Sequence, residues 1–266
     1  MNLTKKQVRD FEDEGYLFIP GAFTNEEVAV LNAEVPGIFA QERPEVWREK
    51  GTQSVRTAFA AHTYNEAFRL LARHPRLIEP AMQLLGGPVY VHQFKINGKA
   101  AFDGDVWQWH QDYGTWARDD LMPEPRAMNV ALFLDDVTEF NGALMLIPKS
   151  HRRGVLEAGH DLATTSYPLW TLDTAEIARL VDEGGLVAPK GAAGSMLIFH
   201  CNLVHASPGN ISPFSRTIVY VSACHVDNHI RRFERDEWIA HRDFTPVECL
   251  ADDCLADLAP PGRPAA

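Results

Sequence analysis

The sequence predicts one domain built mainly from β-strands, with helices gathered in its first third. Three observations lead to this prediction. Helix-capping patterns occur early in the chain, short β-rich runs follow, and no internal repeat or linker divides the 266 residues. Short strands separated by Gly- and Pro-containing turns are typical of a β-sandwich or a jelly roll. We therefore expect a single domain over 1–266, with a helical part at about 1–87, a β core at about 88–226, and a C-terminal helix and tail at 227–266.

The helical part is marked by two capping boxes. Thr4 and Thr24 each stand three residues before a Gln or Glu, so the two side chains of each pair can bond to backbone N–H groups at a helix start. Gly15 is placed to end the first helix. Two further helices are expected in 65–87, broken near Pro75 because proline cannot continue the helical hydrogen-bond ladder.

The β core is marked by short apolar runs rich in β-branched residues. Their length is typical of strands, and turn residues separate them. The expected strands are 89–97, 127–136, 143–148, 195–200 and 217–226, with an earlier one at 16–23. One helix is expected among them at 172–185, and the Pro- and Ala-rich residues 259–266 are expected to form a frayed tail.

Composition excludes several classes of function. The apolar fraction of 45% and the charged fraction of 23% are ordinary for a globular protein. A formal charge of -11 argues against nucleic acid or an anionic membrane as partner, because no basic surface is available to attract phosphates. The N-terminus has no apolar segment of the kind found in signal peptides, and no run approaches eighteen apolar residues. We expect a cytoplasmic protein that acts on a small molecule, in an oligomeric state that the sequence does not specify.

The stretch VWQWHQDYGTW, residues 106–116, places His110 and Asp112 two positions apart among aromatic residues. In an extended segment, side chains i and i+2 point to the same side, so these two can converge on one ion. Two histidines and one carboxylate on one face of an octahedron leave three positions open, as in non-haem Fe(II) oxygenases. Taken alone, such a pair is also explained as two polar residues on a half-buried strand.

A second histidine is available at two nearby positions, His200 and His205. His205 is followed by Ser207, Ser212 and, eleven residues on, Arg216. An arginine there is suited to pair with the distal carboxylate of a bound diacid, and a serine hydroxyl can add a hydrogen bond. The alternative for His200 is a core histidine whose nitrogens are satisfied, and the serines can bond only within their own turn.

Four elements in this order resemble the phytanoyl-CoA dioxygenase family of Fe(II)/2-oxoglutarate-dependent oxygenases. They are the N-terminal segment 3–28, the H-x-D pair, the segment 141–151, and the run H-x-S-x-x-N-x-S-x-x-x-R that begins at His205. The resemblance extends from about residue 3 to about residue 225 and implies a double-stranded β-helix, a cupin-like jelly roll, with flanking helices. It implies Fe(II) bound by His110, Asp112 and His205, 2-oxoglutarate anchored by Arg216, O2 as oxidant, and ascorbate as a supporting reductant. Lys149 departs from the glycine usual at that turn of the family.

Within the family, the segments 54–62, 92–97, 109–136 and 141–148 are similar to those of ectoine hydroxylase and hydroxylases of free amino acids. This similarity implies hydroxylation of an aliphatic carbon of a free L-amino acid or an ectoine-like small zwitterion. Asp112 occupies the position that a halogenase leaves to a small residue, so chlorination is disfavoured. The main alternative is the same chemistry on a carrier-bound, CoA-linked or natural-product scaffold. A Zn(II) hydrolase and a catalytically silent binding protein are alternatives from other classes.

Further contacts are expected around the metal. Gln93, Lys95 and Asn97 alternate with apolar residues, so they share one strand face, and Asn129 has the same polar parity on the next expected strand. We expect Ser207, Gln93, Lys95 and Asn129 to contact 2-oxoglutarate, or in part the substrate.

The substrate contacts expected are Arg56, Trp116 and Asn97, with Arg118 and Arg126 as alternatives to Arg56 for a substrate carboxylate. Trp107, Trp109 and Tyr113 are expected to form an apolar wall, and the loops in 36–62 and 154–190 are candidates for a lid.

Overall fold

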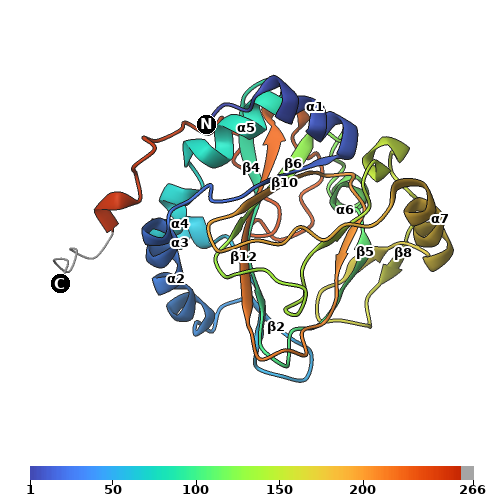
Figure 1. Cartoon of the computed structure of the whole chain (residues 1–266), viewed down its shortest axis with the longest axis horizontal. Coiled ribbons are helices and arrows are strands. Elements are labelled where there is room, and N and C mark those ends of the chain that lie inside the picture. The colour runs from blue at the N-terminus through green and yellow to red at the C-terminus, as the bar shows by residue number, and fades with distance from the viewer. Residues whose placement is uncertain (259–266) are drawn as a thin grey trace.

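The computed structural model describes residues 1–258 and contains two antiparallel β-sheets within them (Figure 1). In spatial order, the large sheet contains β1 (Tyr16–Ile19), β10 (Met196–His200), β6 (Ala127–Phe133), β12 (Arg216–His225), β4 (Val89–Lys99), β3 (Val55–Phe59) and β2 (Val46–Arg48). The small sheet contains β7 (Met145–Leu146), β11 (His205–Ser207), β5 (Trp107–His110), β9 (Leu169–Thr171) and β8 (Gly159–Asp161). Apolar side chains from both sheets form one cluster between them, and the expected jelly roll is confirmed.

Helices cover the outer face of the large sheet (Figure 1). They are α2 (Asn25–Phe39), α3 (Ala61–Tyr64), α4 (Glu66–Leu71) and α5 (Pro75–Leu85), with α1 (Lys5–Glu14) beside β1. Both expected capping boxes are present, at Thr4 and Thr24, and Gly15 ends α1 in the left-handed conformation with φ of 82°. None of the helices in residues 1–258 combines the length and the apolar composition that crossing a bilayer requires.

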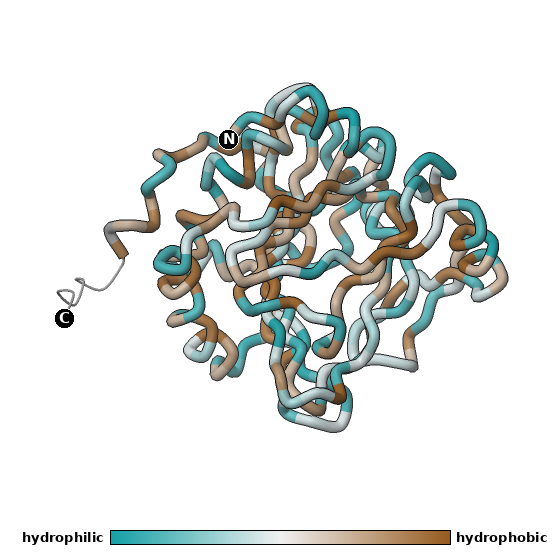
Figure 2. Tube along the Cα trace, in the orientation of Figure 1, coloured by the Kyte–Doolittle hydropathy of each residue, from teal (hydrophilic) through white to brown (hydrophobic). Residues whose placement is uncertain are grey.

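The large sheet is buried on both faces, and this decides where polar residues can stand. Phe94 and Ile96 of β4 point outward to the helices together with Val219 and Val221 of β12, and each is at most 1% exposed. Burying side chains of this size contributes about 1.5–3 kcal/mol each. Hydrophobic segments accordingly run through the middle of the molecule (Figure 2). The opposite face of the same strands turns toward the small sheet, where a cavity accepts polar side chains.

The structure corrects the predicted elements at several places. The part at 1–87 contains two unpredicted strands, β2 and β3, which extend the large sheet. The strand expected at 143–148 is reduced to β7, while the helix expected at 172–185 is present as α7 (Thr174–Gly184). The remaining helix of the core is α6 (Asp112–Asp119), and short 3₁₀ turns lie at Ser150–Arg153, Val226–Asn228 and Ala256–Leu258.

The expected C-terminal helix is wrong for the described residues, because 229–255 contain neither helix nor strand. Several backbone N–H groups of this segment bond to the body of the domain rather than within the segment. His241 donates to the carbonyl of His92 at 3.0 Å, Val247 to that of Val89 at 2.8 Å, and Leu250 to that of Arg73 at 3.0 Å. These tertiary bonds replace the helical ladder. The tail expected at 259–266 lies outside the described residues.

Arg76 of α5 joins the start of α2 to this C-terminal segment. Its Nη1 and Nη2 donate to the carboxylate of Glu27 at 2.8 and 2.9 Å, and its Nε donates to Asp252 at 2.8 Å. The Arg76 and Glu27 side chains are only 16% and 12% exposed. The arginine therefore holds two carboxylates in a partly buried setting.

We expect Arg76→Met to lower the free energy of unfolding by about 1–3 kcal/mol, because both carboxylates lose a charged donor and one is partly buried. Equilibrium unfolding in urea measures the change. The matched control is Arg69→Met, whose partner Glu66 lies on the exposed face of α4, with side chains 55% and 52% exposed. That loss should stay below about 0.5 kcal/mol. Equal losses in the two variants would contradict the bridging role of Arg76.

Candidate active site

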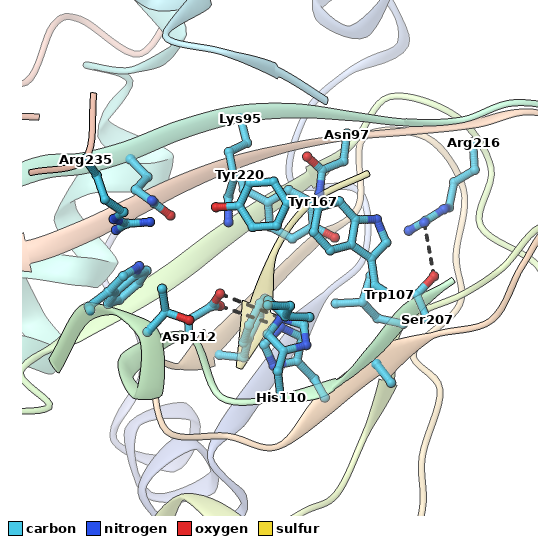
Figure 3. Close-up of a pocket in the computed structure, with 18 residues that line it drawn as sticks. Lys95, Asn97, Trp107, His110, Asp112, Tyr167, Ser207, Arg216, Tyr220 and Arg235 are labelled. Atoms are coloured by element: carbon cyan, nitrogen blue, oxygen red, sulfur yellow. Dashed lines mark hydrogen bonds and ion pairs between the residues drawn. The ribbon is translucent and has the colours of Figure 1, made fainter. Parts of the chain in front are cut away.

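His110, Asp112 and His205 form a buried cluster, of which Figure 3 labels His110 and Asp112. Nε2 of His110 lies 3.8 Å from Oδ1 of Asp112, and Nε2 of His205 lies 3.6 Å from Oδ2 of the same carboxylate. One ligand atom from each residue lies within 4.8 Å of the other two, and no other group of three such residues does so within 1–258. Two imidazoles and one carboxylate at this spacing fit a single ion that keeps open positions.

The two histidines meet because their strands pair. β5 ends at His110, β11 begins at His205, and the two residues stand directly opposite each other in the antiparallel ladder. The sequence had predicted one extended segment through Asp112, but Asp112 is instead the first residue of α6. Gln111 between them remains extended, with φ of -119° and ψ of 128°, so the carboxylate still turns to the side of His110.

Neighbouring carbonyl groups determine which ring nitrogen of each histidine carries the hydrogen. Nδ1 of His110 lies 2.6 Å from the carbonyl oxygen of Gln108, and Nδ1 of His205 lies 2.9 Å from that of Leu203. Because a carbonyl only accepts, each Nδ1 carries the hydrogen and each Nε2 lone pair faces the cluster. Burial, and then the neighbouring His205, lowers the pKa of His110 to about 3, and burial also lowers the pKa of His205. Both imidazoles are thus neutral near pH 7, which is their metal-binding form.

Asp112 is held by a hydrogen-bonded chain that starts on the large sheet. Ser222 of β12 donates to Oδ1 of Asn129 at 2.6 Å, and the Asn129 amide donates to Oδ2 of Asp112 at 2.6 Å. Burial would raise the pKa of Asp112, but the Lys95 ammonium, the two histidines and the Asn129 amide lower it to about 2. The carboxylate is therefore ionised and oriented before any ion binds.

The cluster lies at a cavity between the two sheets (Figure 3). Its lining combines aromatic and apolar walls with a few cationic and amide groups. The lining residues are Gln93, Lys95, Asn97, Trp107, His110, Asp112, Thr115, Trp116, Leu144, Tyr167, Leu169, Phe199, His205, Ala206, Ser207, Arg216, Tyr220 and Arg235.

Arg216 marks one end of the cavity. It is 2% exposed, its Nη2 donates to the Ser207 hydroxyl at 3.4 Å, and its Nε and Nη1 are buried without a partner. Ser207 also donates to the carbonyl of Gly142 at 2.8 Å, which fixes its lone pairs toward the arginine. A buried guanidinium with unpaired donors is costly unless a ligand supplies an anion. The donor set therefore fits a carboxylate that approaches from the cavity, as 2-oxoglutarate bound to the metal would do.

Three polar residues of β4 line the same cavity, as their alternation predicted. Gln93 is 2% exposed, with its Nε2 unpartnered, while the Asn97 amide oxygen accepts from the Thr57 hydroxyl at 2.7 Å. Burial lowers the pKa of Lys95, and the Asp112 carboxylate opposes this shift. These side chains present amide N–H groups and an ammonium to whatever the cavity holds.

Comparison with known proteins identifies the family. The model of the phytanoyl-CoA dioxygenase family matches residues 11–218. The chain is 38% identical to L-proline trans-4-hydroxylase of Streptomyces griseoviridis over 252 residues, covering 91% of this chain and 94% of that protein. It is 37% identical to ectoine dioxygenase of Bordetella parapertussis over 231 residues, or 82% of this chain and 74% of the relative. The chain belongs to the phytanoyl-CoA dioxygenase family.

Solved structures agree with this assignment. EctD from S. alaskensis with 2-oxoglutarate and 5-hydroxyectoine superposes with a TM-score of 0.84 at 30% identity, covering 93% of this chain and 87% of that one. EctD with bound Fe gives 0.82 at 31% identity, covering 94% and 87%. The expected fold, family and enzyme class are confirmed, and this member of the phytanoyl-CoA dioxygenase family is an Fe(II)/2-oxoglutarate-dependent dioxygenase. Its own residues fit both groups, through the His-Asp-His cluster and the unpaired guanidinium of Arg216.

Arg235 is a cavity residue of this dioxygenase that sequence reasoning missed. It lies in the irregular C-terminal segment, where no periodic pattern indicates which side chains face inward. Its Nε donates to Oδ1 of Asp120 at 2.8 Å, and its Nη2 pairs with Oδ2. Tyr220 was also missed, although a signal existed: it stands four residues after Arg216 on β12 and so shares its face.

Other aromatic residues divide between cavity and core. Trp107 and Trp116 line the cavity, whereas Trp109 packs with the apolar cluster under α7 and Tyr113 donates to the Met122 carbonyl at 3.2 Å. Within the expected lid segment 154–190, the hairpin β8–β9 contributes Tyr167 and Leu169 to the lining.

The arginines expected to bind substrate do not reach the cavity. Arg56 is 1% exposed and pairs with Glu49 at 2.9 Å, outside the lining residues. Arg118 donates to the carbonyls of Gly114 and Leu156, and Arg126 to that of Leu85, because their guanidinium groups satisfy neighbouring backbone. Asn129 also differs from expectation in its contact, because its amide bonds to Asp112 and it is not a lining residue.

His200 and Ser212 have local partners. Nδ1 of His200 accepts the backbone N–H of Asn202 at 3.0 Å, and the residue belongs to neither the metal cluster nor the cavity lining. The Ser212 hydroxyl donates to Oδ1 of Asn210 at 2.8 Å within its own turn. Both contacts correspond to the structural alternatives considered from the sequence.

We expect Asn129→Leu to weaken Fe(II) binding by roughly 10- to 100-fold, because the carboxylate of Asp112 loses the donor that orients it. Anaerobic titration with Fe(II) measures the dissociation constant. Ser222→Ala should give a smaller loss of the same kind, since it removes only the next bond in the chain. If both variants bound iron as tightly as the parent protein, the orienting role of Asn129 would be refuted.

Proposed function

We propose that this dioxygenase hydroxylates an aliphatic carbon of a free L-amino acid or an ectoine-like small zwitterion. The observation that carries the proposal is the placement of two arginines at opposite ends of one cavity, with His110 and Asp112 between them (Figure 3). Arg216 is suited to the distal carboxylate of 2-oxoglutarate, and Arg235 to the carboxylate of the substrate. In this arrangement a small acid bound by Arg235 lies on the other side of the metal ligands from the distal carboxylate of 2-oxoglutarate.

The chemistry of the bound groups is common to the enzyme class. Iron and 2-oxoglutarate together activate O2, so that the keto acid becomes succinate and carbon dioxide while a substrate C–H becomes C–OH. The chain itself binds, orients and excludes water. Trp116 is 1% exposed and, with Phe199 and Leu169, provides apolar surface that keeps the reacting carbon away from solvent.

Donors without a partner in the cavity favour a substrate that carries a carboxylate. Nη1 of Arg235 is free of Asp120, which engages only Nε and Nη2. The buried Nε2 of Gln93 and the buried hydroxyl of Thr115 have no partner in the described chain. Asp112 is the one carboxylate among the described lining residues. Because Asp112 is a metal ligand, the acceptors left for a substrate amine are hydroxyl and amide oxygens.

Two relatives named for small zwitterionic substrates, L-proline trans-4-hydroxylase and ectoine dioxygenase, support this substrate class over a carrier-bound or CoA-linked scaffold. The zinc hydrolase and the silent binding protein have no support, because the ligand set is intact and the family is one of dioxygenases. We also propose that ascorbate supports the reaction as a reductant.

We expect substrate-dependent formation of succinate, together with a product heavier by one oxygen atom, when the protein is incubated aerobically with Fe(II), ascorbate, 2-oxoglutarate and a pool of free L-amino acids plus ectoine. Mass spectrometry of the pool identifies the product, and His110→Ala is the blank because it lacks a metal ligand. Succinate without an oxygenated amino acid would favour a larger scaffold as the substrate. No succinate above the blank would refute the proposed reaction.

We expect Arg216→Met to raise the KM for 2-oxoglutarate by roughly 30- to 150-fold, which corresponds to about 2–3 kcal/mol for a lost buried charge-assisted pair. Initial rates at varied 2-oxoglutarate measure it. Arg126→Met is the control, since Arg126 bonds only to the carbonyl of Leu85 and should leave this KM unchanged. An unchanged KM in the Arg216 variant would show that the diacid is anchored elsewhere.

A further inference from the structure

A buried ion pair stands behind the cavity wall, outside the lining itself. Arg56 on β3 is 1% exposed, and its Nη1 donates to Oε2 of Glu49 at 2.9 Å. The Glu49 side chain is 4% exposed. Two charges taken out of water are maintained only where their geometry is well satisfied, so the contacts of this pair indicate what it holds in place.

The pair holds the backbone that leads into β5. Nη2 of Arg56 donates to the carbonyl of Val106 at 2.7 Å, and Oε1 of Glu49 accepts the N–H of Asp105 at 3.1 Å. Nζ of Lys99 donates to the carbonyl of Asp105 at 2.7 Å. The two residues directly before Trp107 are thus fixed by three buried side chains, those of Glu49, Arg56 and Lys99.

Arg56 also contacts the indole of Trp107. Its guanidinium carbon lies 3.9 Å from the ring centroid, while Tyr167 packs on the same indole with a centroid separation of 5.4 Å. Trp107 lines the cavity and stands opposite Ser207 in the ladder between β5 and β11, and Ser207 accepts from Arg216. Figure 3 shows Trp107 beside Ser207 at the Arg216 end.

We propose that the Glu49–Arg56 pair is a positioning device, which fixes the Trp107 indole as a wall of the Arg216 end and thereby sets the affinity of the cavity for its diacid. The inference rests on 2-oxoglutarate being the diacid that Arg216 holds. A planar guanidinium donates in its plane to Glu49 and Val106 while its face stacks on the indole. An ammonium keeps the charge but cannot do both, so Arg56→Lys separates charge from positioning.

The test is a double-mutant cycle with Arg56→Lys, Trp107→Ala and the combined variant. The dissociation constant of 2-oxoglutarate is measured by calorimetry on the Fe(II)-loaded protein without oxygen, and near-ultraviolet circular dichroism reports the tryptophan environment without metal. We expect Arg56→Lys to weaken 2-oxoglutarate binding by about tenfold. The combined variant should bind like Trp107→Ala alone, because an effect transmitted by the indole disappears with the indole. Fe(II) affinity should not change.

The matched control is Arg43→Lys. Arg43 also pairs with a carboxylate, donating from Nε to Glu45 at 2.9 Å, and its guanidinium carbon lies 3.7 Å from the Tyr64 ring centroid, but neither partner lines the cavity. It should leave 2-oxoglutarate binding unchanged. If Arg56→Lys does not fold, Glu49→Gln replaces it in the cycle, with a smaller loss of affinity expected because the contacts of Arg56 to Val106 and Trp107 are kept.

An unchanged dissociation constant, or additive losses in the combined variant, would overturn the proposal. If the parent protein itself does not bind 2-oxoglutarate, the proposed function fails instead, and the dichroism decides the remaining claim. A change of the tryptophan signal in Arg56→Lys that is absent from the Trp107→Ala background supports positioning. The same change in both backgrounds refutes it.

Discussion

The orientation of the Asp112 carboxylate is the constraint on which the rest of the site depends. Asp112 follows the small sheet, while the Asn129 and Ser222 side chains that hold it come from the large sheet. The metal cluster therefore exists only when the two sheets are packed in the native register. A shift of one residue in β6 would turn Asn129 outward and place an apolar side chain against the carboxylate.

The cavity has a charge pattern opposite to that of the whole chain. The formal charge of the protein is -11, yet Lys95, Arg216 and Arg235 line the cavity beside the single carboxylate of Asp112. The buried donors of Arg216 that have no partner reduce stability, so this residue is suited to a ligand rather than to folding. Anions that bind in the cavity neutralise these cations, so ligand binding increases the stability of the folded enzyme.

The sequence predicted those parts of the site that follow a local pattern. The H-x-D pair, His205 and Arg216 are recognisable from spacing, and the polar parity of β4 correctly placed Gln93, Lys95 and Asn97 on the cavity. Arg56 was predicted to bind the substrate, but it lies outside the cavity lining. A buried arginine beside a site can either bind a ligand or support a neighbouring side chain, and only its pairing with Glu49 distinguishes these two roles. Arg235 gave no periodic signal at all.

The same limit explains the errors in the fold. β2 pairs only with its neighbour β3 at the edge of the large sheet, and β3 pairs with β4, which lies about forty residues farther along the chain, so this hairpin belongs to the sheet through a partner distant in sequence. The segment after β12 contains residues that form helices readily, but its N–H groups bond to β4 and to the turn after α4, and these tertiary bonds outweigh intrinsic propensity. Local sequence patterns do not predict such tertiary hydrogen-bond partners.

The position of Arg235 in the chain has a consequence for how the enzyme is assembled. The metal ligands, Arg216 and the tryptophan wall all precede the end of β12 at His225, whereas Arg235 belongs to the segment that docks afterwards through Asp120. The residues that hold the metal and the co-substrate are therefore synthesised before Arg235. Closure of the proposed substrate end depends on the docking of one irregular segment, whereas the metal ligands lie in paired strands and at the start of a helix.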